Sequence, residues 1–361
     1  EEIYALKALM DALGSPNLDC RSDGSALDPK FGRASYLFNA TIAGIEEADG
    51  IMIIGANPRL EAPVLNARIR KRWLSGELKV GLIGEKVDLT YDYHHIGDSP
   101  EALKTFTDHS PVSLKRPIWL VGQGALARPD GAAILSMVAQ ATVSTGAPTE
   151  DWNGFCVLHT AASRVGGLDL GAVPGKGGLS ALRMAKAGAV DVLFLLGADE
   201  ISIEPGAFVV YQGSHGDAGA HRADVILPGA AYTEKSATYV NTEGRVQRSL
   251  RAVFPPGDAR EDWAILRALS EALGHTLPFD NLAALRAAMI GAVPHLGRLD
   301  TVEPADHTGI DALARAGGEV SAEPFTPAFS DFYLTNPIAR ASRTMAECSA
   351  LARGPMAEAA E

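Results

Sequence analysis

Ala48-Asp49-Gly50-Ile51-Met52-Ile53-Ile54-Gly55-Ala56-Asn57-Pro58 is the stretch that decides the fold of this 361-residue chain. Its apolar run, residues 51–54, is entered through Asp49 and closed by Gly55-Ala56-Asn57. A short apolar run bounded by glycine is typical of a strand buried on both faces of a parallel sheet. The carboxyl ends of such strands face the ligand crevice of an open α/β sheet. The stretch therefore predicts an α/β lobe with Gly55 and Asn57 at its crevice.

A second stretch, Ala189-Val190-Asp191-Val192-Leu193-Phe194-Leu195-Leu196-Gly197-Ala198-Asp199-Glu200, repeats this pattern. It predicts a second α/β lobe, with Gly197 and Asp199 as the crevice candidates. We expect Ile51–Ile54 and Val190–Leu196 to be central strands of two separate parallel sheets, because both runs are continuously apolar.

Helical and strand patterns alternate along most of the chain, which predicts parallel sheets joined by crossover helices. Further strands are expected at 79–83, 118–121 and 225–227. Helices are expected at 2–13, 36–48, 62–74, 131–141, 179–187, 262–273 and 282–290. We predict a first lobe at 37–115, a second lobe formed by 1–36 and 116–300, and an irregular tail at 301–361.

The tail is punctuated by glycine and proline and is rich in aromatic residues, namely Phe325, Phe329, Phe332 and Tyr333. Aromatic side chains bury large areas in cores and interfaces. We therefore expect Phe325–Ile338 to lie extended across a surface. That surface belongs either to the chain's own α/β lobe or to a neighbouring subunit, and the sequence leaves both options open.

Composition excludes several classes of protein. Hydrophobic residues make up 47% of the chain, charged residues 21%, and the net charge is −12. The negative charge and the lack of a basic patch interleaved with aromatics argue against a nucleic-acid partner. No apolar run is long enough to span a bilayer, so no direct membrane insertion is expected. The chain begins Glu1-Glu2-Ile3, without Met, and we expect it to be a fragment of something longer.

Local motifs for a metal or a phosphate are weak. Cys20, Cys156 and Cys348 stand far apart and form no Cys-x-x-Cys, so we expect three reduced structural cysteines and no local metal site. The run Gly171–Gly177 fails the phosphate-loop spacing and is expected to be a flexible connection. His215 and His221 lack a supporting helical Glu, which argues against a metalloprotease-type site.

One ordered set of segments carries a resemblance to a known family. It comprises Gly55-Ala56-Asn57-Pro58, Ala223-Asp224-Val225-Ile226-Leu227-Pro228, Glu234 and Asn241-Thr242-Glu243-Gly244-Arg245. Together these segments resemble the molybdopterin oxidoreductase superfamily. The resemblance implies two Rossmann-like parallel-sheet lobes of the molybdopterin oxidoreductase type, plus an extended C-terminal tail.

More specific segments resemble one branch of that superfamily. They are Asn57–Lys71, Asp88–Tyr91, Gly122–Leu126, Tyr211–Asp217 and Phe332–Ile338. These are similar to the carboxyl-terminal region of the G subunit of NADH-quinone oxidoreductase, respiratory complex I. The resemblance covers nearly the whole chain. It implies a peripheral-arm subunit of a complex that passes electrons from NADH to quinone, coupled to proton translocation.

The resemblance also sets expectations about cofactors, partners and place. The iron–sulfur clusters of the parent subunit are expected in an amino-terminal part that this chain lacks. The partners are expected to be other peripheral-arm subunits of complex I. The expected location is peripheral, on the cytoplasmic side of the bacterial inner membrane, or on the matrix side in a mitochondrion.

Departures from the pterin-using enzymes predict that the pterin cofactor was lost. Those enzymes usually carry an Asp-Pro-Arg at the end of a strand, whereas the corresponding strand of this chain ends in Ile83-Gly84-Glu85. Asp199-Glu200 adds two carboxylates that would repel a pyrophosphate. We therefore expect a structural segment with no catalytic residue and no metal, in which Gly55, Asn57, Gly197 and Asp199 mark vestigial crevices. The alternatives are an active molybdopterin-dependent oxidoreductase fragment and a free nucleotide-binding protein that uses the Gly55 and Gly197 crevices.

Overall fold

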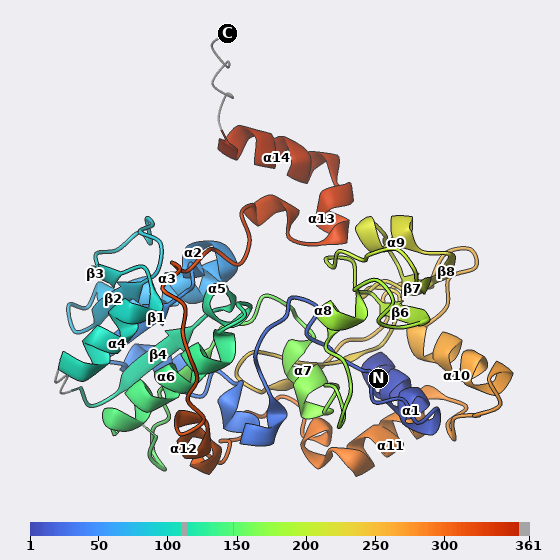
Figure 1. Ribbon diagram of the computed structural model, residues 1–361, viewed down its shortest axis with the longest axis horizontal. Helices are drawn as coiled ribbons and strands as arrows, with labels where there is room; N and C mark the ends of the chain where they lie inside the picture. Colours follow the sequence, from blue (N-terminus) through green and yellow to red (C-terminus); the bar gives the residue numbers. More distant parts are fainter. Residues whose placement is uncertain (110–113, 147, 354–361) are drawn as a thin grey trace, which may run out of the picture.

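Two parallel β-sheets and a long C-terminal segment form the chain in the computed structural model, which describes residues 1–109, 114–146 and 148–353 (Figure 1). The first sheet has the order β3-β2-β1-β4-β5, and the second has the order β6-β7-β8. Neighbouring strands run parallel in both sheets. The predicted α/β class with two parallel sheets is confirmed. The strands are β1 (Gly50–Ile54), β2 (Lys79–Ile83), β3 (His94–Gly97), β4 (Pro117–Val121), β5 (Phe155–Val157), β6 (Val192–Leu196), β7 (Phe208–Gly213) and β8 (Val225–Pro228).

Strand β1 is the central strand of the first sheet, as its continuous apolar run predicts. Ile53 lies between Leu82 of β2 and Leu120 of β4 and is fully buried. One face of the sheet packs against α3 (Pro63–Trp73) through Leu65 and Ile69. The opposite face packs against α6 (Gly131–Ser144). Helices on both faces explain why β1 carries no polar side chain.

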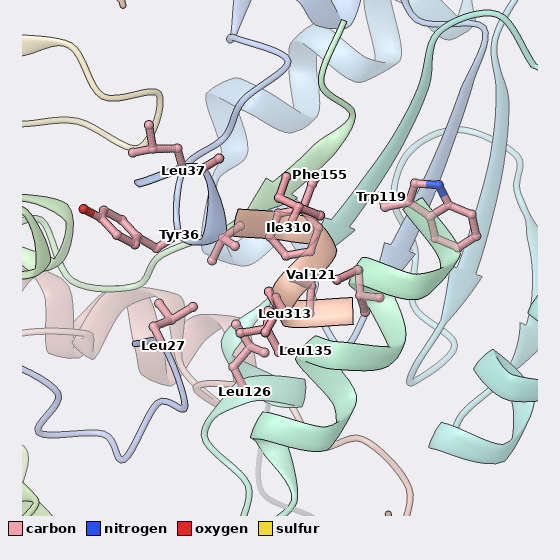
Figure 2. Packing of buried hydrophobic residues seen from close by; sticks show 14 of the residues in the cluster. Leu27, Tyr36, Leu37, Trp119, Val121, Leu126, Leu135, Phe155, Ile310 and Leu313 are labelled. Atoms are coloured by element: carbon pink, nitrogen blue, oxygen red, sulfur yellow. The ribbon is translucent and has the colours of Figure 1, made fainter. Parts of the chain in front are cut away.

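The core on the α6 face includes a helix from the C-terminal segment. Figure 2 shows Ile310 and Leu313 of α12 (Thr308–Ala314) beside Phe155 of β5 and Leu135 of α6. The hydroxyl of Ser136 in α6 donates to the carbonyl oxygen of Leu313 at 2.8 Å. Residues that follow the second lobe in sequence therefore complete the core of the first.

Strand β6 lies at the edge of the three-stranded sheet, so the prediction that it is central is wrong. Strand β7 takes the middle position. Exposure alternates along β6, and Val192 is 60% exposed. Phe194 and Leu196 pack with α1 (Glu2–Ala12) and α10 (Asp262–Ala272) on one face. An apolar run shows that a strand is buried but not which strands flank it, because pairing depends on distant segments.

The predicted lobe boundary at residue 116 also differs from the observed pairing. Strands β4 and β5, assigned from sequence to the second lobe, belong to the same sheet as β1. Parallel strands need long crossovers, so sequence distance is a poor guide to sheet membership. The predicted helix at 36–48 is replaced by an irregular path with one 3₁₀ turn, Ala43–Glu47, because Phe38 forms a bridge with Cys156 and donates its N–H to Thr242 O.

The segment after residue 301 is not irregular throughout, which corrects the predicted tail. It contains α12, a 3₁₀ turn at Phe332–Leu334, α13 (Pro337–Ala341) and α14 (Arg343–Arg353). Between α12 and α13 the chain follows an extended path across the first lobe; α13 then lies next to α9 (Ala218–Arg222), and α14 stands apart from the sheets at the top of Figure 1. Asn336 caps α13 by accepting the Ala339 N–H at 2.9 Å.

The remaining described elements are helices, one antiparallel hairpin and three 3₁₀ turns, Pro29–Phe31, Arg33–Ser35 and Pro294–Gly297. The hairpin pairs β9 (Thr238–Val240) with β10 (Val246–Arg248). The helices are α2 (Pro58–Glu61), α4 (Pro100–His109), α5 (Gln123–Leu126), α7 (Arg164–Asp169), α8 (Ala181–Met184), α9 (Ala218–Arg222) and α11 (Leu282–Ala292). Within the described ranges, no helix is both long and apolar enough to cross a membrane.

The central position of β1 yields a stability prediction. Replacing Ile53, which is fully buried, by Asp should lower the free energy of unfolding by roughly 4 kcal/mol, because a charge would be buried without a partner. Urea unfolding followed by circular dichroism measures the loss. The matched control is Val64→Asp, at an 84% exposed position, which should change little. Equal stability of the two variants would contradict the assignment of β1 as the buried central strand.

Candidate functional site

The first candidate site is the carboxyl edge of the five-stranded sheet, next to Gly55 and Asn57. The strand order changes direction between β1 and β4, and such a switch point is where open α/β sheets bind ligands. Gly55 ends β1 with φ +55°. A Cβ placed on Gly55 would lie 2.6 Å from the Cβ of Ala125 in α5. The space above β1 is therefore already filled by α5.

A second layer of backbone covers α5. A Cβ on Gly124 would lie 2.7 Å from the carbonyl oxygen of Gly55, and it would also collide with the carbonyl oxygen of Thr326. The backbones of β1, α5 and the C-terminal segment thus stack at one point, which only glycine permits. The structure places the Phe325 region of the tail on the chain's own first lobe, one of the two options that the sequence left open.

Side chains hold the C-terminal segment in this place. Phe325 is only 4% exposed, and its N–H donates to Asp98 O at 2.7 Å. Arg128 places its guanidinium over the Phe325 ring, 5.4 Å from the centroid, and donates to the carbonyl oxygens of Glu323 and Pro324. Asp130 pairs with Arg128 and also accepts the Ser321 N–H. We call residues 319–326 the strap.

Three buried oxygens beside this edge have no hydrogen-bond partner among the residues that the structure describes. Asn57 N–H donates to Glu61 Oε1 at 2.6 Å. The buried atoms Asn57 Oδ1, Glu61 Oε2 and Gln123 Oε1 make no hydrogen bond within the described residues. Burial raises the pKa of Glu61 to about 7, against the smaller opposing effect of the Asn57 N–H. Glu61 is therefore partly protonated at neutral pH, whereas the two amide oxygens can only accept, and such oxygens suit hydrogen-bond donors and disfavour a phosphate group.

His159 lies just beyond the end of β5 and is a poor general base. Its Nε2 donates to Tyr36 O at 2.7 Å, and burial lowers the pKa of the imidazole to about 4. A group with that pKa is a weak acceptor of protons at neutral pH. His159 lies in no motif that the sequence analysis singles out, whereas Glu61 and Gln123 lie in segments that carry the family resemblance but give no signal for a site residue.

The second candidate site is at the carboxyl edge of the three-stranded sheet. A cavity of about 290 Å³ lies there, lined by Gly197 after β6, Gly213 and Ser214 at the end of β7, and Lys235 and Asp262. Gly197 has φ +61°, which suits a tight exit from the strand. The structure thus places Gly197 at a cavity.

Asp199, unlike Gly197, does not line this cavity. Its side chain is fully buried and accepts the N–H groups of Gly219 and Asp217 at 2.7 and 3.2 Å. Arg340 of α13 lies 3.6 Å from Asp199, 3.0 Å from Glu200, and also pairs with Asp217. The carboxylates at the exit of β6 are therefore engaged by an arginine of the C-terminal segment.

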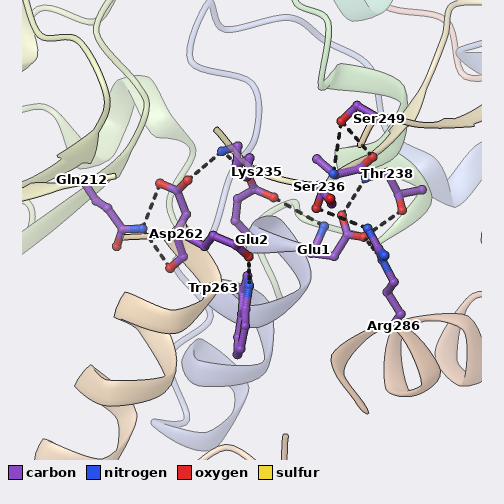
Figure 3. Close-up of polar contacts among 12 residues, drawn as sticks. Glu1, Glu2, Gln212, Lys235, Ser236, Thr238, Ser249, Asp262, Trp263 and Arg286 are labelled. Carbon is purple, nitrogen blue, oxygen red and sulfur yellow. Dashed lines mark hydrogen bonds and ion pairs between the residues drawn. The ribbon is translucent and has the colours of Figure 1, made fainter. Parts of the chain in front are cut away.

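A charge network closes the wall of the cavity (Figure 3). Lys235 pairs with Asp262 at 2.6 Å and with Glu2, and Gln212 Nε2 donates to Asp262 Oδ1 at 3.1 Å. Burial alone would lower the pKa of Lys235, but the two carboxylates outweigh burial and raise it. A lysine held as a cation is not a nucleophile or a base, so this network is structural.

A second buried network joins distant parts of the chain at Asp169 of α7. Its carboxylate accepts from Arg33 Nε at 2.9 Å, Tyr36 OH at 2.8 Å and His295 Nε2 at 2.9 Å. Burial would raise the pKa of Asp169, but hydrogen bonds from His295 and Arg33 outweigh it and lower the pKa. The sequence offers no signal for this cluster, because its members lie far apart along the chain.

In the described part of the chain no group of three or more His, Cys, Asp or Glu residues is arranged to hold a metal ion. Cys20, Cys156 and Cys348 are free. Burial raises the pKa of Cys156 to about 12, which keeps it as an unreactive thiol.

The depressed pKa of Asp169 predicts a pH-dependent contribution to stability. A carboxyl whose folded pKa lies below its unfolded value of about 3.9 stabilises the fold above that pH and loses the effect as the pH falls. Asp169→Asn should cost about 3 kcal/mol at pH 7, because Arg33 loses its buried partner. The loss should shrink below pH 4 in a pH series of urea unfolding curves. Asp258→Asn, at an exposed site, serves as the control. A loss that stays constant down to pH 2 would refute the mechanism.

Docking of the strap predicts that two phenylalanines of the C-terminal segment, one inside the strap and one beyond it, contribute unequally to stability. Phe325→Ala should lower the free energy of unfolding by about 3 kcal/mol, because a ring with 4% exposure leaves a cavity. Phe332→Ala, at a 42% exposed position, is the matched control and should cost less than about 1 kcal/mol. Differential scanning calorimetry of both variants measures this. If the two melting temperatures fall equally, the strap is not docked as described.

Comparisons with known proteins agree on a family. The molybdopterin oxidoreductase family model matches residues 1–272, and the model for the C-terminal region of the NADH-ubiquinone oxidoreductase G subunit matches residues 301–348. The chain is 42% identical to the mitochondrial NADH-ubiquinone oxidoreductase 78 kDa subunit of Neurospora crassa, over 97% of this chain and 48% of that protein.

Two further relatives give the same result. The chain is 40% identical to NADH dehydrogenase [ubiquinone] iron-sulfur protein 1 of Solanum tuberosum, over 97% of this chain and 48% of that protein. It is 40% identical to the NADH-ubiquinone oxidoreductase 75 kDa subunit of Reclinomonas americana, over 97% of this chain and 53% of that protein. The chain thus spans about half the length of the curated relatives that it matches.

Proposed function

Because this chain belongs to the molybdopterin oxidoreductase family, we propose that it keeps the family's fold as a structural module of the G subunit in NADH-quinone oxidoreductase, respiratory complex I. The observation that carries the proposal is the strap, which seals the switch point of the first sheet from above. The match of residues 301–348 to the C-terminal region of the G subunit supports this assignment.

The donors at the two crevices do not fit a pterin nucleotide, which supports loss of the cofactor. A pyrophosphate needs N–H donors, which helix N-termini supply, or cations, which arginines supply. The first crevice offers Asn57, Glu61 and Gln123 as free acceptors. At the second, the cation that lines the cavity, Lys235, is already paired with Glu2 and Asp262. We derive no reaction step through a pterin in this chain.

The role proposed for the whole subunit follows from its relatives. Those proteins are named as subunits of NADH-ubiquinone oxidoreductase, and one is named an iron-sulfur protein. In this proposal the complex transfers electrons from NADH to quinone, coupled to proton translocation, and the iron–sulfur clusters of the subunit lie outside this segment. The module contacts other peripheral-arm subunits on the cytoplasmic or matrix side of the membrane.

The experiment purifies the NADH-oxidising complex from cells that carry an affinity tag on this chain. We expect the chain at one copy per complex, with molybdenum and tungsten at background by inductively coupled plasma mass spectrometry, and no pterin fluorescence after acid release. A molybdenum enzyme purified from the same cells is the control for metal recovery. About one molybdenum or tungsten per chain would favour an active molybdopterin-dependent oxidoreductase instead. Absence of the chain from the complex would refute the structural role.

A further inference from the structure

The hairpin β9–β10 continues as a two-stranded ribbon that carries an exposed apolar surface. Ser249 N–H donates to Ala237 O at 2.8 Å, and the N–H groups of Ala252 and Val253 donate to Thr233 O at 2.9 and 3.2 Å. These bonds hold residues 232–237 and 249–254 side by side. We call this pair of segments the distal ribbon.

Four large apolar side chains of the distal ribbon face solvent in the single chain. Leu250 is 80% exposed, Phe254 77%, Tyr232 63% and Val253 55%. Single exposed apolar residues are ordinary on protein surfaces, but several on one hydrogen-bonded ribbon mark an interaction surface. The hydrogen bonds also lower the conformational entropy that a partner would have to remove on binding.

Arginines surround these side chains although the chain as a whole is acidic. Residues 232–261, which contain the distal ribbon, hold five basic and four acidic residues, whereas the whole chain has a net charge of −12. Arg251 lies over the Phe254 ring at 4.1 Å from the centroid and 3.4 Å from Glu261, which orients both side chains. Among the described residues, neither Arg248 nor Arg260 pairs with a carboxylate, and Arg260 donates to the carbonyl oxygens of Gly257 and Ala259. The sequence alone does not show these arginines as a basic patch, because they are separated from one another along the chain and few aromatic residues lie between them.

We propose that the distal ribbon docks a neighbouring protein subunit that presents carboxylates around an apolar recess. This inference rests on the proposed function, because it needs an assembly in which the chain has neighbours. Phe254 and Leu250 would fill the recess, and Arg248 and Arg260 would pair with its acidic rim. Aromatic and arginine residues dominate binding energy at such centres, and arginine pairs with carboxylates through two parallel hydrogen bonds.

A protein partner fits these observations better than a membrane. An anionic bilayer is an extended plane, so it would meet the acidic remainder of the chain as well as the ribbon. A net charge of −12 opposes that approach over roughly one Debye length, about 8 Å at physiological salt. A protein surface can instead place its carboxylates only where the unpaired arginines lie.

The first test compares assembly of paired variants in the complete complex. The double variants Leu250→Ser with Phe254→Ser, and Arg248→Glu with Arg260→Glu, should each lower the amount of chain in the purified complex at least tenfold. Their isolated melting temperatures should stay within about 2 °C of the unmodified chain, because the altered side chains are exposed. The matched controls lie on α14: Leu351→Ser, at an 81% exposed position, and Arg343→Glu, whose side chain is 94% exposed. Normal assembly of both double variants would overturn the proposal.

The second test identifies what covers the ribbon. A photo-reactive benzoylphenylalanine at position 254 should cross-link, in the assembled complex, to a different subunit at a peptide next to Asp or Glu residues. A cross-link within the same polypeptide, to a second copy, or none at all would overturn the proposal. So would binding of the unmodified chain to phosphatidylglycerol vesicles that is lost in the double variants while assembly is kept. If the unmodified chain itself is absent from the complex, the proposed function fails, which is a distinct result.

Discussion

Gly124 carries no side chain, and this allows three backbone segments to meet at the edge of the first sheet. The carbonyl oxygens of Gly55 and Thr326 both lie where a Cβ of Gly124 would be. Any larger residue would push the strap away from α5, or α5 away from β1. Phe325, Arg128 and Asp130 then hold the strap in that position. The closed state of the switch point depends on this contact more than on any polar side chain near it.

The C-terminal segment also supplies a positive charge to the carboxylates at the exit of β6. Three carboxylates, on Asp199, Glu200 and Asp217, converge on Arg340. Asp199 is fully buried, so its charge would be costly without this partner and the two backbone N–H groups. One segment therefore packs over the crevice of the first lobe and offsets one of the three negative charges at the exit of β6 in the second.

Elsewhere, buried ion pairs hold together segments that lie far apart in the sequence. Asp169 gathers Arg33, Tyr36 and His295, and Lys235 bridges Glu2 and Asp262. These groups come from segments spread between residues 2 and 295. Such networks add little net stability compared with apolar packing, but removing one member leaves a buried charge. They favour one arrangement of these segments over others, which suits a module whose proposed task is to present fixed surfaces to neighbours.

The sequence by itself determined the local features of this protein. The run at Ile51–Ile54 predicted a buried central strand, the alternation of strands and helices predicted two parallel sheets, and the ordered motifs pointed to the family. Gly55 and Gly197 were placed at strand ends because a glycine after a buried strand is a local signal.

Only the tertiary structure decided how these pieces combine. Strands β4 and β5 lie in the same sheet as β1, and β6 lies at the edge of its sheet. Asp199 is buried outside the lining of the cavity, and the strap covers α5. Each outcome depends on contacts between residues far apart in the chain. The roles of residues such as Gly124 and Arg340 cannot be predicted from local sequence, because they arise from the residues that the fold brings beside them. Local patterns set which segments become buried strands or helices, whereas long-range pairing and packing choose their neighbours.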